Sequence, residues 1–159
     1  MSLISARRNE SALKNAWLSE LQAVTIYQTE HLILSLTPFG QLRRKSIAVY
    51  KEVLAEELAH SASLKAYLSS SLVLTLSATA SRASGVFIGL LLSTLPSRMS
   101  WRVHAWAEHQ ASDIYRLTAA KLSGPIAPAL RESLIHAQKQ ERGHALRFET
   151  LFKDHESLL

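Results

Sequence analysis

Glutamate and histidine recur along this chain in a doubled pattern that suits the binding of metal ions. A lone glutamate precedes a Glu-x-x-His unit, and the same order then repeats, at Glu20, Glu57, His60, Glu108, Glu141 and His144. Residues three apart on a helix share nearly one face, so both side chains of each unit reach the same point. Two such units and two further glutamates form the ligand set that holds a pair of iron or manganese ions inside a four-helix bundle.

A single Glu-x-x-His pair is usually only a solvated helix face, whereas the doubled pattern favours a metal site. Four ionised carboxylates carry four negative charges, which two divalent ions would cancel locally. We expect the glutamates of the two Glu-x-x-His units to bridge the metals and the two lone glutamates to bind terminally. Each histidine also needs a partner for its other ring nitrogen, and Glu56 and Gln140 are the candidates.

Two tyrosines repeat with the same offset as the ligands. Tyr27 lies seven residues after Glu20, and Tyr115 lies seven residues after Glu108. Seven residues make nearly two helical turns, so each tyrosine returns to the face of its glutamate. This match is independent of the ligand pattern and indicates two repeated halves. Taken alone, such tyrosines are more often core residues with a satisfied hydroxyl than redox groups.

Apolar spacing and chain breakers predict four long helices and one apolar crossover. The predicted helices are residues 9–36, 41–69, 100–122 and 128–155. Asn9 or Ser11 is expected to cap the first helix, and the breakers lie at 37–40 and 123–125. Residues 70–97 are apolar, rich in small side chains and nearly free of acids. The expected class is all-α, with this crossover between the second and third bundle helices.

Composition narrows the chemistry and the partners. The 159 residues include no cysteine, which excludes disulfides, thiolate-bound zinc, iron–sulfur clusters and thiol nucleophiles. Any metal must then bind carboxylates or imidazoles, which suit iron and manganese. The length favours one domain over residues 1–159. The net charge of +5 favours anionic partners, and without a lysine-rich stripe we expect a membrane surface and no nucleic acid.

The remaining histidines and tryptophans lack a metal-binding pattern. We expect surface or supporting roles for the other five histidines, His31, His104, His109, His136 and His155. The three tryptophans fit packing or interfacial anchoring better than cofactor contact, at Trp17, Trp101 and Trp106.

Over roughly residues 13–155 the chain resembles the demethoxyubiquinone hydroxylase family of di-iron monooxygenases in quinone biosynthesis. SELQAVTIY is similar to the family's first glutamate segment, and EELAH and QERGH are similar to its two Glu-x-x-His segments. AEHQASDIY is similar to its third segment, with Tyr115 in register. GVFIGLLLSTLP is similar in place and character to the region through which the family meets the membrane. The family commonly has histidine directly before this tyrosine, where this chain has Ile114.

The resemblance implies a ferritin-like bundle in which dioxygen and a di-iron centre hydroxylate the ring of a prenylated benzoquinone or quinol. It implies two iron ions as cofactors, with manganese as the alternative metal. The electrons would come from NADH or through the quinol, and Ile114 leaves the donor open. Tyr115 would be a catalytic residue that relays an electron or a proton. A second copy of the chain or other quinone-biosynthesis proteins are the expected protein partners.

A hydrophobic quinone has to be taken from a bilayer, and residues 84–96 suit contact with one. About 13 residues are too few to cross a bilayer but enough to lie in its interface. Arg82, Arg98 and Arg102 are expected to meet lipid phosphates. No signal-peptide pattern opens the chain, so we expect an intracellular protein, peripheral on the cytoplasmic face of the inner membrane or on the mitochondrial inner membrane. The alternative for 70–97 is a buried crossover helix or a dimer contact.

Two other kinds of function remain open from the sequence. Other ferritin-like di-metal proteins would use similar ligands, namely a tRNA hydroxylase, a ferroxidase or peroxidase, or a manganese catalase. A lipid- or quinone-binding helical protein would keep the helices without an active metal.

Overall fold

The computed structural model describes residues 3–36, 41–122 and 127–156, and all regular structure within them is helical. The helices are α1 (Leu3–Leu36), α2 (Gln41–Lys65), α3 (Leu72–Thr94), α4 (Ser97–Lys121) and α5 (Ala127–Glu156). The predicted all-α class is thereby confirmed. The four predicted long helices correspond to α1, α2, α4 and α5. The predicted breakers at 37–40 and 123–125 lie outside the described residues.

The predicted cap of the first helix is wrong. α1 already begins at Leu3, so Asn9 and Ser11 are interior helix positions. The segment contains neither glycine nor proline, and polar residues alone do not interrupt a run with otherwise favourable helix propensities. A local capping signal is overridden here by the surrounding sequence.

The apolar crossover is itself a regular helix, α3. Its N-terminus is capped by Ser71, whose Oγ accepts a hydrogen bond from the backbone N–H of Leu74 at 3.1 Å. It ends before Leu95, and Pro96 stands directly before α4, as suits a residue that cannot continue a helix. The 23-residue helix α3 contains an 18-residue stretch with a mean hydropathy of 1.3, so it is long and apolar enough to cross a membrane by length and composition alone. The predicted stretch of about 13 residues, 84–96, thus lies mostly within a longer helix, because Ser and Thr residues join two apolar stretches into one.

α3 packs closely along α1 through two glycines. A Cβ atom added to Gly85 would lie 2.7 Å from the carbonyl oxygen of Gln22, and one added to Gly89 would lie 2.8 Å from Thr29 Cβ. Only a residue without a side chain lets the two backbones approach this closely. Ser81 Oγ also donates to the carbonyl oxygen of Leu18 at 2.5 Å. α1 is therefore held on one side by α3.

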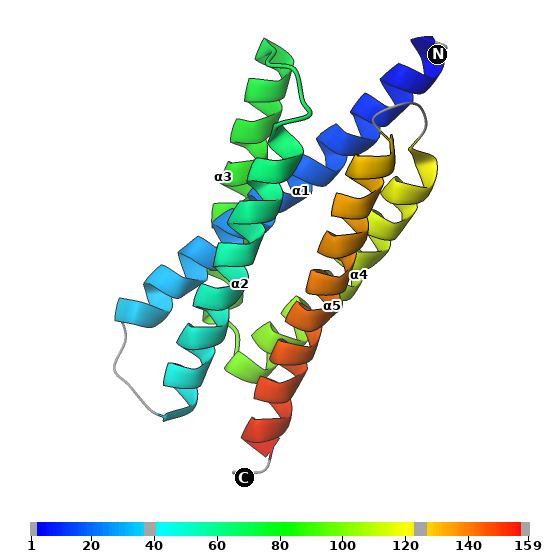
Figure 1. Ribbon diagram of the computed structural model, residues 1–159. Helices are drawn as coiled ribbons and strands as arrows, with labels where there is room; N and C mark the ends of the chain where they lie inside the picture. The colour runs from blue at the N-terminus through cyan, green and yellow to red at the C-terminus, as the bar shows by residue number, and fades with distance from the viewer. Residues whose placement is uncertain (1–2, 37–40, 123–126, 157–159) are drawn as a thin grey trace.

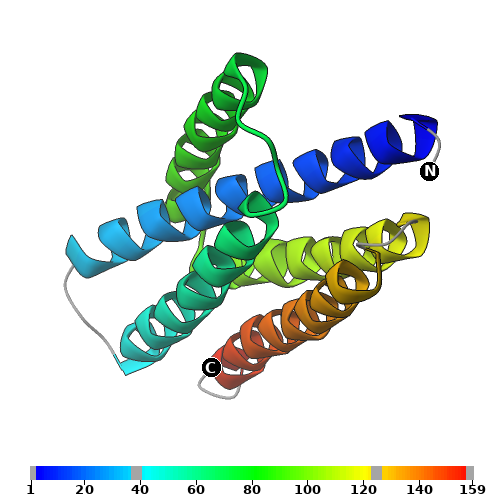
Figure 2. The ribbon, with the colours of Figure 1, turned by 45° about the horizontal axis from the view of Figure 1, so that its top comes forward.

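The other four helices converge around a buried polar layer. α4 and α5 pack along each other, α1 packs on α2, and α2 also contacts α5 (Figures 1 and 2). One apolar cluster includes Trp17, Tyr115 and Leu134, and a second includes Tyr27, Tyr50 and Phe148. All six of the glutamates and histidines singled out by the sequence are buried, and none belongs to either cluster.

Candidate metal centre

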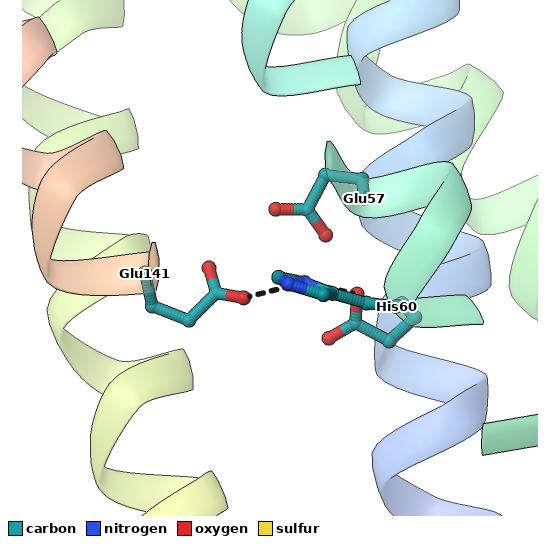
Figure 3. A group of neighbouring side chains, drawn as sticks. Glu57, His60 and Glu141 are labelled. Atoms are coloured by element: carbon teal, nitrogen blue, oxygen red, sulfur yellow. Dashed lines mark ion pairs between the residues drawn. The ribbon is translucent and has the colours of Figure 1, made fainter. Parts of the chain in front are cut away.

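The six predicted ligands come together from four helices. Glu20 lies on α1 and Glu108 on α4, and the Glu-x-x-His units lie on α2 and α5. Their exposed fractions lie between 0 and 8%. Glu57 and His60 point from α2 toward Glu141 on α5 (Figure 3). The helical spacing of three residues therefore does what the sequence predicts, because it directs both members of each unit to one place.

The six side chains form two overlapping groups. One group contains Glu20, Glu57, His60 and Glu141, and the other contains Glu57, Glu108, Glu141 and His144. In each group one possible ligand atom per residue lies within 4.8 Å of all the others. Glu57 and Glu141 belong to both groups. This is the arrangement expected if the glutamates of the two Glu-x-x-His units bridge a pair of ions.

Both histidines present Nδ1 to the carboxylates. His60 Nδ1 lies 3.0 Å from Glu141 Oε1 and 3.6 Å from Glu20 Oε2. His144 Nδ1 lies 3.2 Å from Glu57, 3.4 Å from Glu108 and 3.3 Å from Glu141. Nδ1 is thus the nitrogen of each ring that is available to a metal.

Several polar atoms in this layer are buried and lie close to one another, yet they form no hydrogen bond of normal geometry. They are Glu20 Oε2, Glu57 Oε1, His60 Nδ1 and both carboxylate oxygens of Glu141. Unpaired buried polar atoms are costly and rare in folded proteins. Carboxylate oxygens and imidazole nitrogens are ligands of divalent iron and manganese, so the donor set fits two such ions.

The proton affinities of these groups reflect crowding of like charges in a buried place. Burial, followed by the charge of Glu20, raises the pKa of Glu57 well above its usual range. Burial raises the pKa of Glu141 to about 7. Burial lowers the pKa of His60, but contacts with the carboxylates of Glu141 and Glu20 outweigh it and raise the value to about 10.

The second histidine is affected even more strongly. Burial lowers the pKa of His144, but its contacts with Glu108, Glu141 and Glu57 outweigh this effect and raise the value to about 12. Without metal, the layer therefore holds protons where two cations would neutralise it. Metal binding would release those protons.

Glu56 and Gln140 contact the outer nitrogens of the histidines, as predicted. His60 Nε2 lies 2.9 Å from Gln140 Oε1, and His144 Nε2 lies 3.0 Å from Glu56 Oε2. The Gln140 amide also donates to Glu56 Oε2 at 3.1 Å, which joins the two contacts into one chain. Arg147 Nη1 donates to Glu56 Oε1 at 3.0 Å. One histidine is therefore supported by a carboxylate and the other by a neutral amide.

The two tyrosines contact the glutamates of the opposite halves. Tyr115 donates its hydroxyl hydrogen to Glu20 Oε1 at 2.5 Å, and Tyr27 donates to Glu108 Oε1. Burial and the nearby carboxylates raise the pKa of both phenols. Ile114, which directly precedes Tyr115, is 43% exposed. The tyrosines are thus placed to orient the two lone glutamates.

A second buried polar cluster was missed by the sequence analysis. Glu30 on α1 accepts a hydrogen bond from Ser100 Oγ at 3.0 Å and lies 3.4 Å from the donating Tyr50 hydroxyl. Its other oxygen lies 2.6 Å from His104 Nε2. All four side chains are buried. His104 was expected at the surface or in a supporting role, and it is a core residue that stacks on Tyr27 with ring centroids 5.0 Å apart.

A spacing signal for this cluster was present in the sequence. Glu30 follows Tyr27 by three residues, and His104 precedes Glu108 by four. Such offsets keep residues on one helix face. By contrast, His109 forms an exposed pair with Glu149 on α5, with 3.1 Å between Nε2 and Oε1, as its surface role predicts.

The comparisons with known proteins give no relative for this chain. No protein-family model matches it, and no curated protein or solved structure is significantly similar to it. The resemblance stated from the motifs therefore stays a prediction. The function has to be inferred from the residues of the site.

Proposed function

We propose that this chain is a ferritin-like di-iron monooxygenase that hydroxylates the ring of a prenylated benzoquinone or quinol. The observation that carries the proposal is the pair of overlapping ligand groups that share Glu57 and Glu141. Two shared carboxylates with one histidine in each group suit a dinuclear centre. Helices α1, α2, α4 and α5 would form the bundle, and α3 would be the crossover.

Charge balance supports two divalent ions. Four ionised glutamates in a buried layer would repel one another, and two ferrous ions would cancel their charge. If bound there, ferrous ions would supply the electrons for a reaction with dioxygen. The protein's own groups hold the ligand geometry: Tyr27 and Tyr115 fix the lone glutamates, and Glu56 and Gln140 fix the histidines.

The exposed side of α3 is evidence for a hydrophobic substrate that arrives from a membrane surface. Its exposed apolar side chains lie opposite the face that packs on α1, and they are Leu72, Val73, Leu76, Val86, Phe87, Leu90 and Leu91. Arg82 is exposed beside them. The guanidinium groups of Arg98 and Arg102 instead lie over the ring of Phe152, at 5.0 and 4.1 Å from its centroid. Of the three arginines, Arg82 is the one best placed for lipid phosphates.

Metal content tests the centre first. Purified protein loaded anaerobically with ferrous iron should bind about two ions, measured by plasma mass spectrometry after gel filtration. Glu57→Ala should remove both ions because this residue belongs to both groups. Glu52→Ala is the matched control, since Glu52 is an exposed glutamate on the same helix. Unchanged iron in Glu57→Ala would contradict the site assignment.

Oxygen incorporation tests the reaction. The iron-loaded protein, a reductant and a short-chain benzoquinone should give a hydroxylated ring that carries label from ¹⁸O₂. Two manganese ions and release of dioxygen from peroxide would instead favour a catalase. A folded protein that binds quinone but takes up neither metal would leave only a binding function.

A further inference from the structure

A cavity leads to the candidate metal centre between α1 and α4. Its volume is about 120 Å³, and its walls include the four glutamates of the centre together with Tyr27 and His104. Small side chains complete it, among them Ala23, Ala107 and Ala111. The cavity beside His60 and Tyr115 has only about 30 Å³, which is room for little more than a water molecule. The α1–α4 cavity is therefore the roomier approach to the centre.

His104 is fixed in the wall of this cavity by Glu30. Since Nε2 lies 2.6 Å from a carboxylate oxygen, this nitrogen carries the proton and donates it. Glu30 is itself held by Ser100 and Tyr50. Within the described part of the chain no hydrogen bond involves His104 Nδ1, which is the accepting nitrogen of this tautomer. The ring thus has one nitrogen committed to the protein and one left for a ligand.

We propose that His104 is a substrate-binding residue whose Nδ1 accepts a hydrogen bond from a ring hydroxyl, and that the cavity takes one hydroxylated aromatic ring. The proposal rests on the proposed function for the class of ligand. A cavity of about 150 Å³ accepts benzene, so a single ring would fill this cavity of about 120 Å³ and extend into its opening. The alanines offer apolar walls, and the histidine distinguishes a phenol or quinol from an ether of the same shape.

Two matched probes test this role, 4-methylphenol and its methyl ether 4-methylanisole. Isothermal titration calorimetry should show about tenfold tighter binding of the phenol to the wild-type protein. The double variant Glu30→Gln/His104→Phe keeps an aromatic ring and leaves no lone buried carboxylate. It should bind both probes with equal affinity. Ala111→Leu should weaken both probes together by filling the cavity.

The chain offers a matched control in its other glutamate–histidine pair. His109→Phe/Glu149→Gln makes the same changes in an exposed pair between α4 and α5, and it should keep the tenfold preference. A measurement without variants uses protein labelled with ¹⁵N in histidine. One ring-nitrogen signal should move with 4-methylphenol and stay fixed with 4-methylanisole.

The outcomes separate this inference from the proposed function. Equal binding of the two probes by the wild-type protein, or a preference kept by the double variant, would overturn the role of His104. All titrations are run on metal-free and on zinc-loaded protein. A phenol preference in a chain that binds no metal would support His104 and overturn the metal centre alone.

Discussion

The two ends of the candidate metal centre use the same side chains in different surroundings. At the end that contains Tyr27, Glu108 and His144, a cavity of about 120 Å³ and the Glu30–His104 pair adjoin the ligands. At the end that contains Tyr115, Glu20 and His60, the neighbouring cavity is about 30 Å³. The Tyr27 end and the Tyr115 end therefore differ in the size of the neighbouring cavity and in the buried Glu30–His104 pair, which only the Tyr27 end has among the described residues.

The difference lies in residues outside the repeat. Ten residues after the lone glutamate stands Glu30 in the first half and Thr118 in the second. The position four residues before the lone glutamate is Ala16 in the first half and His104 in the second. Because the halves cross, both polar residues gather at the Tyr27 end. A repeated ligand set therefore fixes where metal would bind, and a few unrepeated residues decide from which side it is reached.

The largest expected effect comes from removing the His104 imidazole at the Tyr27 end. His104→Leu should lower the free energy of unfolding by about 3–5 kcal/mol, because it leaves the buried Glu30 without its closest partner. Thr118→Val, at the position of the second half that matches Glu30 in the first, should cost less than about 1 kcal/mol. Urea unfolding of metal-free protein measures both. A similar loss in the free energy of unfolding for both variants would contradict the difference between the two ends.

The tyrosines test whether the ends differ in chemistry. Tyr115→Phe removes a hydroxyl 2.5 Å from Glu20 and should lower quinone hydroxylation about 100-fold with two irons retained, as for a proton-relay group. Wild-type turnover would remove the role assigned to Tyr115. Tyr27→Phe makes the same change at the Tyr27 end of the centre. An equal fall in both variants would mean that the tyrosines serve as equivalent supports of their glutamates.

Proton binding gives opposite pH trends for stability and metal affinity. The raised pKa values of His60 (about 10) and His144 (about 12) stabilise the metal-free fold below pH 6.5, and this stabilisation is lost as pH rises through those values. The pKa of Glu141 is raised from 4.5 to about 7, so this carboxylate also makes the fold less stable as the pH rises between these values. The free energy of unfolding should fall by about 1.4 kcal/mol per pH unit for each extra proton bound.

Metal affinity should rise over the same range, because each ion displaces protons. Urea unfolding at pH 6 and pH 8.5, with a metal titration at both, measures the two trends. The lowered pKa of Glu108 acts below pH 4.5, outside this window. A metal-free protein that is more stable at pH 8.5 would contradict the assignment.

The smallest effect concerns the residues behind the histidines. Glu56 supports His144 with a carboxylate, whereas Gln140 supports His60 with an amide, so the ion beside His144 should bind more tightly. Glu56→Gln should weaken that ion about tenfold and bring the two binding steps together. Calorimetric titration with ferrous iron under nitrogen resolves the steps. Two equal steps in the wild-type protein would show that the ends do not differ in affinity.

The sequence predicted what depends on spacing within one helix. The Glu-x-x-His units follow from positions three residues apart on a single helix. Glu56 and Gln140 were predicted from their places beside the ligand glutamates, but each contacts the histidine of the other helix. The Tyr–Glu contacts require the relative register of α1 and α4, which no local pattern sets. The Glu30–His104 pair and the close fit of Gly85 on Gln22 also join separate helices. These contacts arise from packing, where the tertiary arrangement decides.

The crossed tyrosine contacts have an evolutionary consequence. A single hairpin that carried one lone glutamate, one tyrosine and one Glu-x-x-His unit would leave its tyrosine and its glutamate unpartnered. Two copies related by a two-fold axis would complete both contacts at once. This chain thus holds in one polypeptide what a dimer of hairpins would hold in two, with α3 as the join. Within one polypeptide each half could change independently of the other, and either half expressed alone would need a second copy to complete its contacts.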